Sequence, residues 1–265
     1  MTRWKAASYH FLISLIVIGT IVSLIFWRWD PPALYQVTGA AHLLVILIGV
    51  DLVLGPLLTL IVYKAGKKTL RSDLTVIALV QVAALAFGLH VFWKTRPVYL
   101  VAISDRFRLV FANEIDEASR GRAPAAFRGM PAWGPITVAA PLPQDGKRRL
   151  EVMLDTVAGL DISQQPEYFR PYPEGADDTL ANALPARRAL ALAPADVRAD
   201  WQAAIGGRDD IAVLPLSSSR GSATILIDRN TGRILGFLSL DPWPIFNKPL
   251  NPKGQQENST GTASH

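Results

Sequence analysis

Residues 43–63 read LLVILIGVDLVLGPLLTLIVY, an apolar run with one carboxylate, Asp51, near its middle. A membrane-spanning helix needs about 20 predominantly apolar residues, so this run is long enough to cross a bilayer. A charge inside such a helix costs roughly 2.5 to 3.5 kcal/mol on insertion scales, so Asp51 needs a reason to be there. Gly55 and Pro56 follow one turn later and predict a kink, because proline removes a backbone hydrogen bond. Two interpretations are open: the kink shapes a groove for a partner helix, or the proline is tolerated and has no functional role.

Two similar apolar runs flank this one, so the sequence predicts a membrane protein with three transmembrane helices. The predicted spans, within a transmembrane domain over residues 1–96, are about 11–27, 43–63 and 74–93. A basic start followed by an apolar centre is also typical of a secretory signal. No small-residue cleavage site follows the first run, which ends instead in tryptophans and prolines at 27–32. Tryptophan favours the membrane interface, so we expect an uncleaved span.

The basic residues predict the orientation of the three spans. Residues 1–96 hold nine basic and three acidic residues, whereas residues 97–265 are nearly neutral, with eighteen and nineteen. Six of the nine basic residues lie near the span ends on the same side of the membrane as the amino terminus, and three lie near the opposite ends. Because basic residues favour the cytoplasmic side, the amino terminus is expected to be cytoplasmic. The sequence therefore predicts a multi-pass protein of the bacterial inner membrane whose carboxy-terminal domain is periplasmic. The near-neutral remainder argues against nucleic acid as a partner.

Residues 97–246 predict a small α+β extracytoplasmic domain with antiparallel hairpins. Apolar segments at 98–103 and 107–111 flank a Ser-Asp turn, and three short apolar runs near the end form a meander whose last turn is Asp228 to Gly232. Residues 136–140 predict a short strand. Helices are expected from Asp145, at 177–184 and from Pro194 to 205; in the first, Leu150, Met153, Leu154 and Val157 share one face. Residues 247–265 have too little apolar content to fold and predict a disordered tail.

The composition argues against an enzyme, a cofactor or a metal site. The chain has no cysteine, and the only histidine after His90 is the last residue, His265. The absence of cysteine excludes thiolate chemistry, and the scarcity of histidine argues against a Ser-His-Asp site or a histidine-ligated metal in the outer domain. The adjacent acid pairs at 177–178 and 209–210 are typical of helix caps and turns, since neighbouring side chains point in different directions.

Helix geometry suggests internal partners for Asp51. At 1.5 Å per residue, its carboxylate lies roughly 12 Å below the outer end of its span. Polar residues at similar depth on the other two helices are Thr20, Ser23 and Gln81. Three roles are open to Asp51: a buried group that ties the helices together, a contact for a polar group of another membrane protein, or part of a proton or ion path. Gly19 and Ser23 also form a small-residue pair that allows close helix approach.

The run from Gly49 to Leu60, GVDLVLGPLLTL, resembles the signature of the type IV pilin accessory proteins, the TfpX/TfpZ or FimB-like group. The resemblance is dense up to about residue 112 and thin beyond it. The further matching segments are Arg71-x-Asp73-Leu74, Ala78-Leu79-x-Gln81, Arg96-Pro97-Val98, Asp105-Arg106-Phe107, Asp228-x-x-Thr231-Gly232 and Asp241-Pro242-Trp243.

This resemblance implies an inner-membrane accessory protein, chaperone-like, that binds and stabilises type IV pilin or helps to assemble it. It implies a role in fimbrial biogenesis and twitching motility, other pilus assembly proteins as further partners, and no catalytic residues or cofactor. The alternative is a membrane-anchored extracytoplasmic sensor that binds a ligand. That reading requires another membrane protein for output, because the predicted cytoplasmic segments are short.

Overall fold

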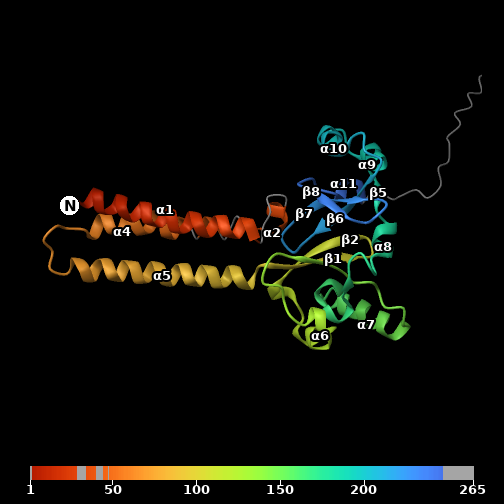
Figure 1. Ribbon diagram of the computed structural model, residues 1–265, viewed down its shortest axis with the longest axis horizontal. Coiled ribbons are helices and arrows are strands. Elements are labelled where there is room, and N and C mark those ends of the chain that lie inside the picture. The colour runs from red at the N-terminus through yellow and green to blue at the C-terminus, as the bar shows by residue number, and fades with distance from the viewer. Residues whose placement is uncertain (1, 29–33, 40–43, 47, 247–265) are drawn as a thin grey trace, which may run out of the picture.

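The computed structural model describes residues 2–28, 34–39, 44–46 and 48–246. Its elements form a bundle of long helices followed by a sheet-rich outer domain (Figure 1). The disordered tail predicted for residues 247–265 lies outside the described residues.

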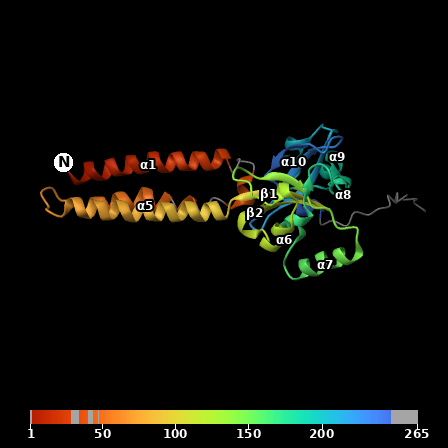
Figure 2. The ribbon, with the colours of Figure 1, turned by 60° about the horizontal axis from the view of Figure 1, so that its bottom comes forward.

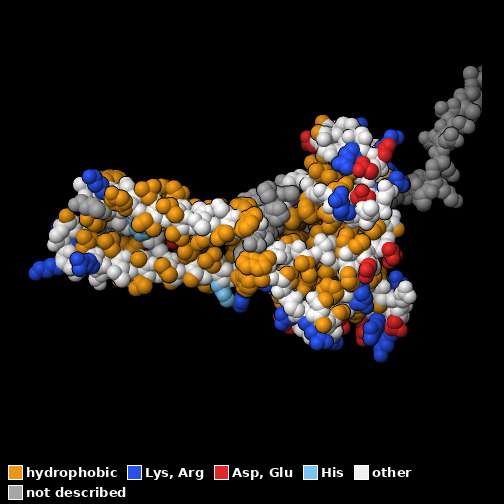
Figure 3. Space-filling model, in the orientation of Figure 1, with side chains coloured by type: hydrophobic (Ala, Val, Ile, Leu, Met, Phe, Trp, Pro, Cys, Tyr) orange, Lys and Arg blue, Asp and Glu red, His pale blue; other side chains and the backbone are white. Residues whose placement is uncertain are grey.

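The bundle contains three apolar helices, as the sequence predicts. They are α1 (Arg3–Arg28), a second helix made of the π-helical η2 (Gly49–Leu54) and α4 (Gly55–Val62), and α5 (Leu70–Lys94). Only 6% of the most apolar stretch of α5 is buried within the protein, and a helix that is apolar all round without protein cover is typical of a membrane span. By length and composition, each of the three could cross a bilayer. Figure 3 shows hydrophobic side chains over the bundle and basic ones at its far end.

The outer domain is built on an eight-stranded mixed sheet in the described chain. Its strands are β1 (Pro97–Ile103), β2 (Arg106–Phe111), β3 (Ile136–Ala139), β4 (Arg170–Pro171), β5 (Leu184–Pro185), β6 (Ile211–Ser217), β7 (Ser222–Asp228) and β8 (Ile234–Leu238). The order is β4-β3-β1-β2-β6-β7-β8, and β5 pairs with β6. Both predicted hairpin units are present, β1–β2 and the meander β6–β7–β8. They join through parallel pairing of β2 with β6, which the sequence does not predict.

Helices cover both faces of this sheet. They are α6 (Glu117–Arg122), α7 (Gly146–Val157), α8 (Asp177–Ala181), α9 (Ala186–Leu192), α10 (Arg198–Ile205) and α11 (Trp243–Phe246). The helix expected from Pro194 instead begins at Arg198, and the helix expected over 177–184 ends at Ala181 because Leu184 and Pro185 pair with β6. The sequence does not predict α9 at all.

Side chains of β1 alternate between two hydrophobic cores, as successive residues of a strand must. Leu100 and Ala102 pack with Phe107 on one face of the sheet. Tyr99 and Val101 pack on the other face, where the Tyr99 ring meets Phe169 edge-on at 5.0 Å between ring centres. All seven residues of β1 are buried, which identifies it as a central strand.

The first core also takes in a short segment from between the first two long helices, α2 (Tyr35–Thr38) and its neighbour Leu34. Leu34 and Val37 are 1% and 0% exposed and belong to the same hydrophobic cluster as Leu100, Ala102 and Phe107. Ser218 donates a hydrogen bond from Oγ to the Val37 carbonyl at 2.6 Å. The described segment of this connection, residues 34–39, is therefore part of the outer domain.

Arg220 fastens this segment. Its Nη1 donates to the Thr38 carbonyl at 2.7 Å, and its guanidinium carbon lies 3.9 Å from the centre of the Phe111 ring. Burial lowers the pKa of Arg220 below its ordinary value, yet arginine stays charged at any physiological pH. A second arginine, Arg96, sits where α5 enters β1 and donates to the carbonyls of Trp93 and Pro131 at 2.8 to 3.2 Å.

We predict that Arg220→Ala destabilises the purified full-length protein by about 2 kcal/mol, because a hydrogen bond from a charged donor is worth roughly 1.5 to 3 kcal/mol. Thermal unfolding in detergent measures the effect. The matched control is Arg187→Ala, whose ion pair with Asp209 is exposed, with Arg187 at 81%. Exposed pairs contribute about 0 to 1 kcal/mol. Equal losses for the two variants would contradict the role of Arg220.

Candidate functional site

A groove runs between α1 and α5, over the second helix. Both α1 and α5 pack against α4. The lining residues are His10, Ile13, Ser14, Val17 and Ile18 of α1, Asp51, and Ala78, Gln81, Val82 and Leu85 of α5. Its volume is about 180 Å³. Because liquid water occupies about 30 Å³ per molecule, the groove has room for a side chain of a docked helix.

Asp51 lies in this groove and is 5% exposed. Its Oδ2 has no hydrogen-bond partner among the described residues. Buried carboxylates normally satisfy their oxygens, because leaving a polar atom unpaired in an apolar surrounding is costly. Asp51 is therefore poised to accept a hydrogen bond from a group outside the described chain.

The backbone around Asp51 is unusual as well. Residues 49–54 are wound as a π-helix, and Gly55 N–H donates to the Val50 carbonyl, five residues back. In that winding the donor for the Asp51 carbonyl would be residue 56, which is proline and has no N–H. This widened turn lies directly before Gly55 and Pro56, where the sequence predicts a kink. Single π-helical turns are frequent at functional sites.

Gln81 of α5 supplies the missing donor. Its Nε2 donates to the Asp51 carbonyl at 3.4 Å. The approach depends on Gly55, because a Cβ at that position would lie 2.0 Å from Gln81 Nε2. The structure thus brings together four of the residues singled out in the sequence: Asp51, Gln81, Gly55 and Pro56.

Thr20 and Ser23 are not brought to Asp51. Both are exposed, and the Thr20 hydroxyl donates to the Ile16 carbonyl of its own helix. With Gly19 they line a separate shallow groove on α1. At about 100° per residue, Ser23 lies on the side of α1 opposite Ser14, which does reach the groove. Similar depth in the membrane is therefore not enough to predict the partners of Asp51, because the side chains must also lie on the helix face that points toward it.

Sequence reasoning missed the polar residues that α1 contributes, His10 and Ser14. Thr59 Oγ1 and His10 Nδ1 are hydrogen-bonded at 2.5 Å, and Ser14 and Thr59 are 8% and 3% exposed. A signal was available in the spacing of four. His10 and Ser14 share one face of α1, while Asp51, Gly55 and Thr59 share one face of the second helix.

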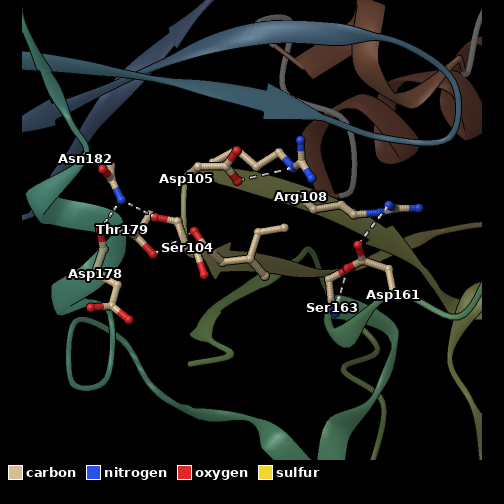
Figure 4. Close-up of polar contacts among 10 residues, drawn as sticks. Ser104, Asp105, Arg108, Asp161, Ser163, Asp178, Thr179 and Asn182 are labelled. Atoms are coloured by element: carbon tan, nitrogen blue, oxygen red, sulfur yellow. Dashed lines mark hydrogen bonds and ion pairs between the residues drawn. The ribbon is translucent and has the colours of Figure 1, made fainter. Parts of the chain in front are cut away.

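Polar contacts in the outer domain hold elements together (Figure 4). Arg108 pairs with Asp161 at 3.7 Å, Thr179 Oγ1 donates to the Ile103 carbonyl at 2.8 Å, and Asn182 Nδ2 donates to the Ser104 carbonyl at 2.9 Å. These contacts attach helices to the β1–β2 hairpin. Among the described residues, no three His, Cys, Asp or Glu side chains gather as a metal site.

Comparison with known proteins places the chain in one group. It is 28% identical over 233 residues to the fimbrial assembly protein of serogroup I from Dichelobacter nodosus, covering 85% of this chain and 91% of the relative. It is 31% identical over 113 residues to the fimbrial assembly protein of serogroups C1 and C2 from the same organism, covering 42% and 86%. No protein-family model matches, and no solved structure matches. The chain belongs to the fimbrial assembly proteins, a family of type IV pilus biogenesis.

Proposed function

We propose that the protein is a chaperone-like accessory factor of the bacterial inner membrane that binds type IV pilin and stabilises it before or during assembly. The observation that carries the proposal is the buried, unpartnered Oδ2 of Asp51 in a groove between two apolar helices. Membership of the fimbrial assembly proteins supports pilus components as partners.

The groove is suited to a helix that brings a hydrogen-bond donor. Its walls are mostly apolar side chains, and Asp51 offers an acceptor within them. In an apolar surrounding a polar contact between helices is worth about 1 to 2 kcal/mol in model peptides. The resemblance implies that a pilin resides in the membrane, before assembly, as a single apolar helix that bears polar groups. Docking would satisfy one such group and the Asp51 carboxylate together.

The charge distribution supports a cytoplasmic amino terminus and a periplasmic outer domain. Lys and Arg gather at the bundle end that carries the amino terminus and the α4–α5 connection (Figure 3). Basic residues near span ends favour the cytoplasmic side. The outer domain, at the opposite end of the bundle (Figure 1), then faces the periplasm.

We predict that Asp51→Leu reduces co-purification of pilin with the full-length protein about tenfold, the change that 1 to 2 kcal/mol produces. Asp51→Asn, which keeps an acceptor oxygen, retains more pilin. Thr20→Val is the matched control, since Thr20 lies on another face of α1. Pilin recovered equally with wild type and Asp51→Leu would rule out the carboxylate. Twitching motility of the variant strains gives a second readout.

We also predict that Gly55→Ala weakens pilin binding while Gly19→Ala does not. The new methyl group at residue 55 would displace Gln81 from the Asp51 carbonyl and so alter the floor of the groove. A Cβ at Gly19 would meet nothing within 4 Å. Quantitative co-purification compares the two variants; a loss for Gly19→Ala alone would indicate that the partner binds the other face of α1.

A cytoplasmic amino terminus and a periplasmic outer domain predict a pattern of cysteine labelling. The chain has no native cysteine, so only the introduced cysteine reacts. In whole cells, Ala203→Cys on α10 should react with a membrane-impermeant maleimide. Lys68→Cys, in the connection before α5, should react only after the membrane is opened. The reverse pattern would place the outer domain in the cytoplasm and would remove the proposed pilin-binding arrangement.

A further inference from the structure

The amphipathic helix α7 turns its apolar face away from the protein. Leu150, Met153, Leu154 and Val157 are 57%, 53%, 60% and 88% exposed. We call these four side chains the α7 face. Of the large hydrophobic residues that are exposed in the described outer domain, the only others are Trp133 and Ile136. Exposed apolar clusters of this kind mark interaction sites.

None of the four side chains of the α7 face belongs to the hydrophobic cores of the described outer domain. The only side chain of α7 that is buried is Val152. The opposite side of the helix, with Arg148, Glu151 and Asp155, lines a polar cavity. Asp145 caps the helix by accepting from the Arg148 N–H at 2.9 Å. Figure 2 shows α7 standing out from the rest of the outer domain.

The charged side chains of the first turn of α7 are basic, whereas Glu151 and Asp155 lie on the opposite side of the helix from the face. Lys147, Arg148 and Arg149 occupy the first turn, which contains no acid. Cations at a helix amino terminus are unfavourable, because the helix dipole is positive there. Lys147 and Arg149 neighbour Leu150 and Met153 on the helix surface, at spacings of three and four. The carboxylate of Asp145 at the N-cap offsets part of this charge, and a partner with acidic side chains beside an apolar patch would offset more of it.

The figures argue against two other occupants. Figures 1 and 2 place α7 beyond α6, on the side of the outer domain remote from the bundle, so the bilayer around the bundle does not reach it. The helix runs obliquely along the bundle axis rather than across it in both views. Two copies in one membrane share their direction along the membrane normal, so the α7 helices of the two copies run in the same direction along that normal. Self-pairing would then not bring the basic first turn of one copy beside the acids of the other.

The face is also small. A stable interface buries roughly 800 Å² on each partner, more than four partly exposed side chains supply. Such a contact suits a partner that is already tethered nearby, because tethering raises its effective concentration. A client whose membrane helix occupies the groove meets this condition, since its extracytoplasmic part is held beside the outer domain.

We propose that the α7 face is a second contact for the pilin client and takes an apolar, acid-flanked patch on its extracytoplasmic part. This inference rests on the proposed function, which supplies the tethered client.

The test measures binding of the full-length major pilin of the source bacterium to the full-length protein in lipid nanodiscs. We expect Leu154→Glu to weaken binding at least about tenfold, and the double variant Lys147→Glu/Arg149→Glu to weaken it and to reduce its salt dependence. Ala203→Glu, which adds the same charge to an exposed site on α10, should bind like wild type. Thermal unfolding of Leu154→Glu and Ala203→Glu should match wild type, and the double variant should be at least as stable as wild type, because acids are favourable at a helix amino terminus.

Each alternative result has a distinct meaning. Wild-type affinity in Leu154→Glu together with weak binding by Asp51→Leu would overturn the α7 contact and leave the groove standing. No binding of pilin to wild type would overturn both proposals. Self-association of pilin-free wild type that Leu154→Glu abolishes would assign the face to a second copy and would also overturn this inference.

Discussion

The packing of the bundle is constrained by the backbone carbonyl of Asp51, which its own helix leaves without a hydrogen-bond donor in an apolar surrounding. Pro56 deprives the Asp51 carbonyl of its donor in the π-helical winding, and a polar backbone group must be satisfied by protein where water is absent. Gln81 provides that donor from α5, and Gly55 provides the space for it. The contact fixes α5 against the second helix, while the hydrogen bond between His10 and Thr59 fixes α1. The groove lies between α1 and α5, each of which is held against the second helix by one of these two hydrogen bonds.

The outer domain is tied to the bundle at both of its entrances. The segment around Val37, between the first two long helices, is part of the core beneath the sheet, and Arg220 holds it there. At the other entrance, α5 leads directly into β1 and Arg96 braces the junction. These contacts set the described segment between the first two helices and the start of β1 at defined positions in the outer domain.

Signals carried by a single segment could be read from the sequence. Length and hydropathy predict the three helices, turn residues predict the hairpins, and depth predicts that Gln81 meets Asp51. Features set by rotation or long-range packing could not. Depth does not distinguish the Ser14 side of α1 from the Ser23 side, and amphipathicity predicts α7 without saying whether Leu154 faces core or solvent. The burial of Val37 results from a contact with residues some 180 positions later.

The strength of the two proposed contacts would suit an accessory factor that releases pilin into a growing fibre. One polar contact between helices contributes about 1 to 2 kcal/mol, and a face smaller than a standard interface adds a limited amount. Neither proposed contact alone would hold pilin for long, whereas two connected contacts would hold it by raising each other's effective concentration. Loss of either contact then releases the client quickly. A deep pocket or an obligate interface would stabilise pilin more strongly but would retain it.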